Sequence, residues 1–210
     1  MTTTAHPLRL HRFALSGHAH RAELMLSLLG LPFERIDVDL ANKAHKSAAF
    51  LAINPFGQVP VLQDGDVTLA DSNAILVYLA MKYGGDTWLP RDPLGAARVQ
   101  RWLSVAAGLL AFGPAAARLA MLFKAPLNQA EAVARAHALF AVIEAELGAM
   151  PFITGDAPTI ADVALYSYTA HAPEGGISLD AYPRLRAWLK RIEELPGFVP
   201  MQASPLPATA

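Results

Sequence analysis

The sequence predicts two units, a mixed α/β unit followed by an all-helical unit. Up to about residue 80, apolar residues recur with both strand and helix periods, whereas after about residue 93 the patterns are helical. Between these parts lies KYGGDTWLPRDP, whose paired glycines and two prolines favour a linker. With 210 residues, 53% of them apolar, the chain can bury a sizeable core. We therefore expect domains at 1–84 and 93–210, joined by a linker at 85–92.

The first unit begins with a strand, a helix and a second strand. Residues 8–13 alternate apolar and polar side chains, and apolar residues at helical spacing follow until Gly30 and Pro32 end the helix. Residues 33–40 alternate again. Because a helix separates the two strands, we expect them to lie parallel in a βαβ unit.

A hairpin and a helix complete the first unit. Residues 59–63 and 66–69 flank Asp64 and Gly65, a pair suited to the positive φ angles of a two-residue turn. An apolar face at helical spacing then predicts a helix that starts near Ser72. This order, βαβ followed by ββα, matches the thioredoxin-like arrangement.

The second unit is expected to consist of helices at about 93–123, 128–147, 159–171 and 183–194. Thr159 with Asp162 forms a capping box, and Pro183 suits a first helical turn. The Phe112-Gly113-Pro114 stretch is expected to bend or break the first of these helices.

Composition excludes several kinds of partner and site. Seventeen basic and eighteen acidic residues give a net charge of −1, so we expect neither nucleic acid nor a membrane surface as a partner. The absence of cysteine removes disulfides, thiolate metal sites and cysteine nucleophiles, so any sulfur chemistry must come from a ligand. The start lacks the apolar core of a secretory signal, and the uncharged run 102–117 is shorter than the ~20 residues of a membrane span. We expect a cytoplasmic protein with a buried helix there.

Three short motifs contain groups suited to a small charged peptide. Val59-Pro60 stands where a strand begins, and either a trans proline or a cis bond that turns the Val59 backbone toward an extended peptide fits there. Asp71 and Ser72 stand at the start of a helix. The helix N-terminus favours a ligand carboxylate, and Asp71 could hold a ligand ammonium group. Alternatively, the two residues are ordinary helix caps. Ser16, between the first strand and helix, could donate to an anion or simply cap the helix.

The order of these motifs resembles the glutathione transferase family over nearly the whole chain. The resemblance is carried by FALSGHAHRAELMLSLLGLPFE, by HKSAAFLAINPFGQVPVLQDGDVTLADSNAILVYLA and by ITGDAPTIADVALY. It implies a thioredoxin-like domain that binds glutathione as cosubstrate, and a helical domain that shapes the site for a small hydrophobic electrophile. It also implies a homodimer.

The resemblance places Ser16 at the thiol, as the catalytic residue. Tyr78 is the first tyrosine and cysteine is absent, so the family branches that use either residue near the N-terminus are excluded. Where similar proteins often have asparagine two places after the serine, this chain has His18.

The other glutathione-binding residues that the resemblance implies are His45 and Lys46 near the glycyl carboxylate, Gln58, Val59 and a cis Pro60 along the peptide backbone, and Asp71 and Ser72 at the γ-glutamyl group. Composition alone favours an ordinary solvated pair for His45 and Lys46, and only the family resemblance supports the binding role.

In the second unit we expect Phe112 and Arg118 to line the electrophile site, because the helix should bend there; packing in the core is the alternative. Trp102 is assigned to the core, and Tyr166 and Tyr168 are further candidates for either place. No metal is expected, because His18 and the histidine two residues later point in different directions at the start of a helix.

Three functions remain open at this point. The first is conjugation of glutathione to an electrophile, and the second is glutathione-dependent reduction of peroxides or disulfides. The third is a non-catalytic carrier, since a fold can be reused for binding alone. The intact set of Ser16, Pro60, Asp71 and Ser72 favours an enzyme.

Overall fold

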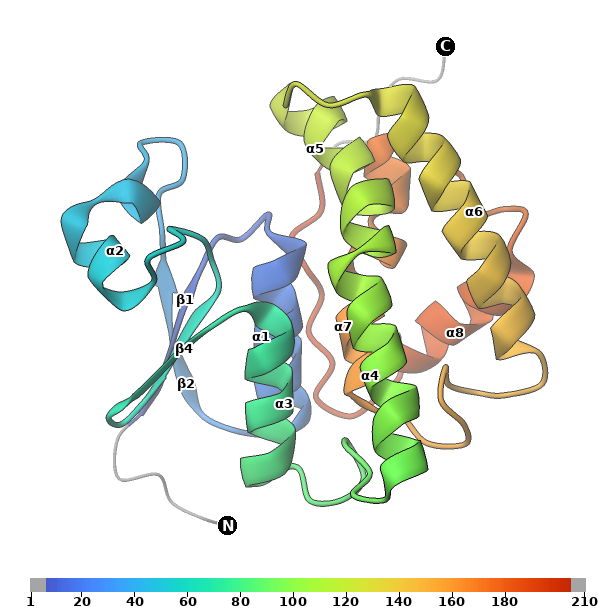
Figure 1. The fold of residues 1–210 in the computed structure, drawn as a ribbon, viewed down its shortest axis with the longest axis horizontal. Coiled ribbons are helices and arrows are strands. Elements are labelled where there is room, and N and C mark those ends of the chain that lie inside the picture. The colour runs from blue at the N-terminus through green and yellow to red at the C-terminus, as the bar shows by residue number, and fades with distance from the viewer. Residues whose placement is uncertain (1–6, 205–210) are drawn as a thin grey trace.

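The computed structural model describes residues 7–204; residues 1–6 and 205–210, at the outer ends of the two expected domains, lie outside the described residues. A sheet with its helices lies beside a group of longer helices (Figure 1). In chain order the elements are β1 (Leu8–Arg12), α1 (Gly17–Leu28), β2 (Phe33–Asp37), η1 (Ala44–Lys46), α2 (Ala48–Ile53), β3 (Val61–Asp64), β4 (Val67–Ala70), α3 (Ser72–Tyr83), α4 (Pro93–Ala107), η2 (Ala111–Ala115), α5 (Ala116–Phe123), α6 (Gln129–Leu147), α7 (Ile160–Ala170), η3 (Ala172–Gly175) and α8 (Pro183–Glu193).

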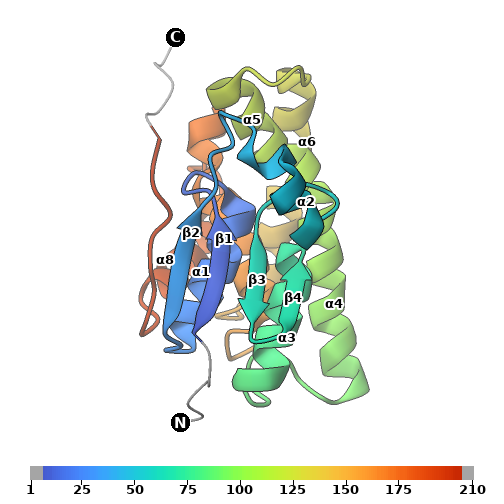
Figure 2. The ribbon, with the colours of Figure 1, turned by 90° about the vertical axis from the view of Figure 1, so that its left-hand side faces the viewer.

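The sheet has the strand order β2-β1-β3-β4, shown face-on in Figure 2. β1 and β2 are parallel, and β3 pairs antiparallel with both β1 and β4, which confirms the thioredoxin-like arrangement. The hairpin turn lies one residue later than expected, because Asp64 pairs with Val67 and leaves Gly65 and Asp66 as the turn. The carboxylate of Asp64 accepts a hydrogen bond from Lys82 (2.7 Å), which holds this residue in the strand.

Helices α1 and α3 lie between the sheet and the second unit, where both contact α7 (Figure 1). One continuous apolar core therefore runs from Leu10 of β1 through Leu24 of α1 to Trp188 of α8. The short helix α2 lies on the other face of the sheet, where Phe50 packs with Val38 and Val61. This helix is absent from the sequence expectations, since Phe50 is its one buried residue.

The first long helix of the second unit is interrupted at the Phe112-Gly113-Pro114 stretch, as expected, and α4 itself ends at Ala107 with Gly108 as its C-cap. α4 is followed by the π-helical turn η2, which contains Pro114, and then by α5. A wider turn accommodates a proline ring that a regular helix would exclude. Taken as one helical stretch, Pro93–Phe123 is long and apolar enough for a membrane span by length and composition. Core helices of water-soluble proteins pass the same test, and Trp102 within this stretch is buried.

Candidate functional site

A cavity of about 850 Å³ lies between the two units. Its volume is in the range typical of small-molecule sites. The eight residues assigned from the sequence to glutathione all line it, and so does Arg118. The full lining is Phe13, Leu15, Ser16, His18, Leu40, Ala41, His45, Lys46, Asn54, Phe56, Gly57, Gln58, Val59, Pro60, Ala70, Asp71, Ser72, Ala111, Ala115, Arg118, Leu119, Phe123 and Tyr168.

Ser16 caps the N-terminus of α1. Its Oγ accepts a hydrogen bond from the Ala19 N–H (3.2 Å), so the hydroxyl hydrogen can be donated to another group. The first turn of α1 contains no acidic side chain, so the helix end keeps its positive potential for a ligand. The preceding loop is fixed by the Ser16 N–H, which donates to Phe13 O (2.9 Å), and by Arg118, which donates to Leu15 O (2.7 Å).

Asp71 and Ser72 open α3 at the edge of the cavity. Asp71 is exposed and adopts φ 76°, and its Oδ1 accepts bonds from the N–H groups of Asn73 and Ala74, each at 2.9 Å. Within residues 7–204 no group donates to its Oδ2. Asp71 thus caps the helix and still presents a carboxylate oxygen to a ligand. Ser72 is buried at the helix start.

The segment ahead of β3 supplies backbone to the cavity. The Val59–Pro60 peptide bond is cis, as expected. Asn54, which is 2% exposed, donates from Nδ2 to Gln58 O (2.7 Å) and accepts from the Phe56 N–H (3.1 Å). This bracing residue is missing from the sequence-based assignments, although asparagine beside proline is a typical turn signal.

His45 and Lys46 reach the cavity from η1. Lys46 Nζ donates to the carbonyl oxygens of Phe56 (3.2 Å) and Gly57 (3.0 Å), which keeps its charge at the cavity wall. Among the described residues, the buried Nδ1 of His45 has no hydrogen-bond partner. Gly57 has φ 58°, and a Cβ there would lie 2.7 Å from His45 O, so glycine allows the two segments to touch.

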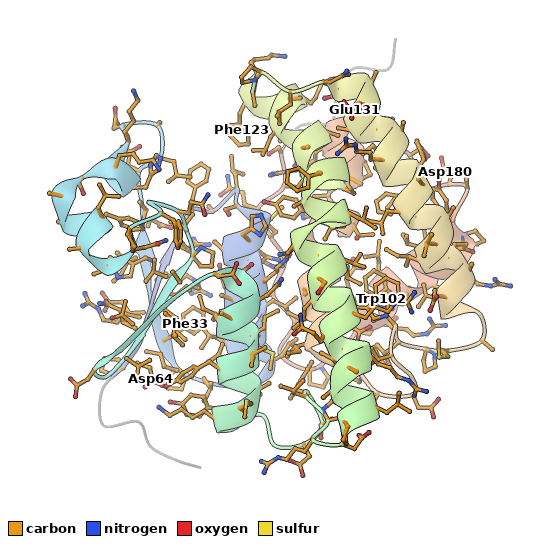
Figure 3. The ribbon with its side chains drawn as sticks, viewed as in Figure 1. Phe33, Asp64, Trp102, Phe123, Glu131 and Asp180 are labelled. Carbon is orange, nitrogen blue, oxygen red and sulfur yellow. The ribbon has the colours of Figure 1, made fainter. Side chains whose placement is uncertain are left out.

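An apolar wall comes from η2 and α5. Its members follow at four-residue intervals along one helical face: Ala111, Ala115, Leu119 and Phe123. Phe123, labelled in Figure 3, marks the end of this wall. The structure does not bring Phe112 to the cavity: it is 62% exposed, because it lies one residue past Ala111 and so faces another side of the helix. Arg118 lines the cavity, but its guanidinium is buried and pairs with Glu174 (2.6 Å).

His18 and Tyr168 add polar groups to the cavity: the sequence assignments give His18 no binding role, and they make Tyr168 a candidate for the electrophile site or the core. Burial, with the charge of Arg21, lowers the pKa of His18 to about 3, so its imidazole is neutral at pH 7. The His18 ring meets the Tyr168 ring edge-on, with 5.0 Å between centroids. Tyr168 also packs against Gly17, where a Cβ would lie 2.8 Å from its Cζ. The second unit therefore contacts the α1 N-terminus directly.

The second histidine of the HAH sequence faces away from the cavity. His20 is buried, with Nδ1 2.8 Å from Ser167 Oγ and Nε2 2.8 Å from Val199 O. Within residues 7–204, no three His, Cys, Asp or Glu side chains group as metal ligands would.

Comparison with protein families matches both parts of the chain. The model described as "Glutathione S-transferase, N-terminal domain" matches residues 7–81, and "Glutathione S-transferase, C-terminal domain" matches residues 105–196.

Individual proteins are similar over most of their length. Glutathione S-transferase 3 of Zea mays is 37% identical, with 96% of each chain covered, and human glutathione S-transferase theta-2 is 35% identical over 80% of this chain and 73% of its own. A crystal structure of glutathione S-transferase from Pseudomonas fluorescens Pf-5 superposes with a TM-score of 0.88, at 35% identity, over 94% of this chain and 100% of that chain. A glutathione transferase homolog from Drosophila mojavensis with bound glutathione has a TM-score of 0.82, at 30% identity, over 90% and 89%.

Proposed function

The chain belongs to the glutathione S-transferase family, and from this premise we propose how its cavity binds glutathione and activates the thiol. The catalysed reaction of the family is conjugation of glutathione to an electrophile. The observation on which our assignment of residues depends is that Ser16, His45, Lys46, Gln58, Val59, Pro60, Asp71 and Ser72 all line one cavity.

Ser16 is proposed as the catalytic residue that holds the glutathione sulfur as a thiolate. A free thiol with a pKa near 8.5 is only about 3% ionised at pH 7, and a depression of about two units, or roughly 2.7 kcal/mol, makes it mostly thiolate. A charge-assisted hydrogen bond contributes about 1.5–3 kcal/mol and a helix N-terminus about 0.3–1 kcal/mol. The free hydroxyl hydrogen of Ser16 and the positive end of α1, whose first turn has no acidic side chain, supply these two contributions.

The rest of the tripeptide is proposed to lie across the first unit. The γ-glutamyl ammonium group pairs with Asp71, and its carboxylate accepts from Ser72 and the start of α3. The cysteinyl backbone pairs with the extended segment of Gln58 and Val59. The glycyl carboxylate lies near Lys46, whose ammonium group is already held at the cavity wall by two carbonyl oxygens.

The electrophile is proposed to be small and hydrophobic. The apolar wall of Ala111, Ala115, Leu119 and Phe123 supports this, since it offers no charged group to a cosubstrate. On the family resemblance we also propose a cytoplasmic homodimer with domains at 1–84 and 93–210.

Reduction of peroxides or disulfides by the same thiolate is a competing chemistry. A panel of an aromatic halide, an organic hydroperoxide and a mixed disulfide, assayed with glutathione, ranks the three reactions. We expect the aromatic halide to be the best substrate. Binding of glutathione without turnover of any of the three would instead indicate a carrier.

A crystal structure with glutathione tests the residue assignments directly. We expect the sulfur within hydrogen-bond distance of Ser16 Oγ and the γ-glutamyl group at Asp71 and Ser72. Glutathione bound elsewhere in the chain would contradict the proposal.

A further inference from the structure

Arg118 and Glu174 form an ion pair that is closed off from solvent. They are 1% and 3% exposed, and Arg118 Nε donates to Glu174 Oε2 at 2.6 Å. Burial of such a pair requires the desolvation of both charges, and apolar residues of similar volume often give equal or greater stability. Stability of the fold is therefore a weak explanation for the two charges, and their other contacts indicate a further role.

The guanidinium of Arg118 joins three segments of the chain. Besides Glu174 of η3, it contacts Leu15 O in the loop before α1 (Nη1, 2.7 Å) and Ser204 Oγ after α8 (Nη2, 3.4 Å). Because a guanidinium is a planar, rigid fork, the direction fixed by one partner determines where the other nitrogens point. The carboxylate of Glu174 thus determines how Arg118 meets Leu15.

Glu174 is itself held from several sides. Its Oε1 accepts from the Ser204 N–H (2.9 Å) and lies 2.7 Å from His171 Nδ1, while Oε2 accepts from Arg118. The neighbouring Gly175 lets η3 lie against α5, since a Cβ there would be 2.7 Å from Arg118 N. Both oxygens of the carboxylate are therefore engaged, and its position is fixed.

The carbonyl of Leu15 belongs to the peptide unit that leads into Ser16. Arg118 donates to the oxygen of this unit, and the N–H of the unit, which is that of Ser16, donates to Phe13 O (2.9 Å). A peptide unit is planar, so contacts at both of its polar groups fix its orientation. That orientation is one determinant of the direction in which the Ser16 side chain leaves the backbone. The contact at Leu15 O has a charged donor, which makes it stronger than a neutral hydrogen bond.

A direct attraction between Arg118 and a thiolate is a weaker explanation. All three guanidinium nitrogens have partners within the chain, and the charge of Glu174 offsets that of Arg118. The contact through which Arg118 can act on the chemistry is therefore the carbonyl of Leu15.

We propose that Arg118 and Glu174 are positioning residues for the thiol chemistry. Glu174 orients the guanidinium of Arg118, which holds the peptide unit between Leu15 and Ser16 so that the Ser16 hydroxyl meets the glutathione sulfur. This inference rests on the proposed function, which places the sulfur at Ser16. Arg118 lines the cavity, whereas Glu174 is not among its lining residues. In this role Arg118 needs no contact with the electrophile.

A double variant, Arg118→Met with Glu174→Met, separates this role from support of the fold. It removes both charges together and leaves neither unpaired in the interior, so we expect it to fold. The thiolate absorbance of bound glutathione, titrated against pH, should then show a thiol pKa raised by about one unit. We also expect kcat to fall by about tenfold, because the Ser16 hydroxyl is no longer held in place.

S-methylglutathione reports on the rest of the glutathione site. It has no thiol to ionise, and the residues proposed to bind its charged ends, such as Lys46 and Asp71, belong to η1 and the start of α3. We therefore expect calorimetry to find its affinity for the double variant within about threefold of the wild-type value. A general loosening of the fold would weaken this affinity as well.

Two single variants complete the design. Arg118→Lys keeps a charge beside Glu174 but not the planar fork, and we expect it to raise the thiol pKa as well. His20→Gln is the control, because the buried His20 side chain also joins α1 to α7 but bonds to Ser167 rather than to Leu15. We expect this variant to keep the wild-type thiol pKa. Urea unfolding beforehand identifies which variants fold.

Three results would overturn the inference. The first is a folded double variant with the wild-type thiol pKa, and the second is an equal rise of that pKa in His20→Gln. The third is a loss of S-methylglutathione affinity by the same factor as kcat, which would show a structural role alone. If the double variant does not fold, a wild-type thiol pKa in Arg118→Lys overturns the inference instead.

Ser16→Ala distinguishes failure of the inference from failure of the proposed function. If Ser16→Ala leaves the thiol pKa unchanged, the proposed role of Ser16 fails and the inference fails with it. If Ser16→Ala raises the thiol pKa and the double variant does not, only the inference fails.

Discussion

The Ser16 hydroxyl serves both the fold and the proposed chemistry. Its oxygen accepts the Ala19 N–H and so caps α1, while its hydrogen stays available to a thiolate. The backbone leading into Ser16 is held independently of that hydroxyl, because the Ser16 N–H donates to Phe13 O and Arg118 donates to Leu15 O. Removal of the hydroxyl should therefore leave the loop in place.

We expect Ser16→Ala to lower turnover by about 10- to 100-fold and to raise the pKa of bound glutathione by about one to two units, because one charge-assisted hydrogen bond is lost. The ultraviolet absorbance of the thiolate, titrated against pH, measures the pKa shift.

Asn128→Ala is the matched control for Ser16→Ala. Asn128 caps α6 by accepting the Glu131 N–H (3.1 Å), away from the cavity lining. Each substitution should cost about 1 kcal/mol of stability through loss of a cap, but only Ser16→Ala should change the thiol pKa. Identical titration curves for the two variants would remove Ser16 from the mechanism.

At the scale of elements, the cavity depends on close contact between η1 and the segment before β3. Lys46 of η1 donates to the carbonyls of Phe56 and Gly57, and Asn54 braces the same segment through Gln58 O. Gly57 lies at the point of contact. The geometry of the proposed glycyl and cysteinyl subsites thus depends on a residue without a side chain.

Gly57→Ala should weaken glutathione binding by at least about tenfold, since its Cβ would overlap His45 O at 2.7 Å and force the two segments apart. Gly65→Ala is the matched control: Gly65 also has φ 58°, but nothing lies within 4 Å of its Cβ position. Both variants should lose about 1 kcal/mol of stability, because alanine is strained in the left-handed backbone conformation. Calorimetry should find wild-type affinity in Gly65→Ala, and equal affinities in the two variants would show that the contact at Gly57 does not shape the site.

The elements with local signals could be predicted from the sequence. The polar residues at its start and its apolar face predict the helix that begins at Ser72. The capping box of Thr159 and Asp162 predicts the start of α7, and both of its hydrogen bonds are present. The helix α2 could not be predicted, because six residues with only Phe50 buried give no period.

The cavity could be predicted only in part. Residues in short motifs, such as Asp71 at the start of α3, do line one cavity. Phe112 does not, because the π-helical turn decides which face of the helix meets the cavity. The burial of Arg21 could not be predicted from the sequence either, because arginine is mostly exposed in proteins.

On the scale of the whole molecule, α1 is shared by the two units. His20 contacts Ser167 of α7, and its other ring nitrogen meets Val199 in the segment after α8, which returns past the sheet in Figure 2. Arg118 of α5 holds Leu15 just before α1. Because the cavity lies between the units, these contacts also fix the distance between the glutathione subsites and the apolar wall.

The buried histidines make this junction sensitive to acid. Burial, as the largest cause, lowers the pKa of His20 from 6.5 to about 4. The folded state thus binds its proton less readily than the unfolded state, and stability rises with pH between about 4 and 6.5. The full contribution is present above pH 6.5 and is lost as pH falls; a shift of this size corresponds to about 3 kcal/mol. Carboxylates whose pKa is lowered in the folded state, such as Glu174, change the stability mainly below about pH 4.3.

We therefore expect the free energy of unfolding to fall by several kcal/mol between pH 6.5 and 4.5, and His20→Gln to flatten that slope. The variant should be less stable than the wild type at pH 7.5, because Gln cannot reproduce both 2.8 Å contacts of the imidazole, and this deficit should shrink as the pH falls. His18, whose pKa is lowered to about 3, keeps part of the slope in the variant. Urea unfolding at a series of pH values measures both curves. Parallel curves for the two proteins would show that protonation of His20 does not contribute to acid unfolding.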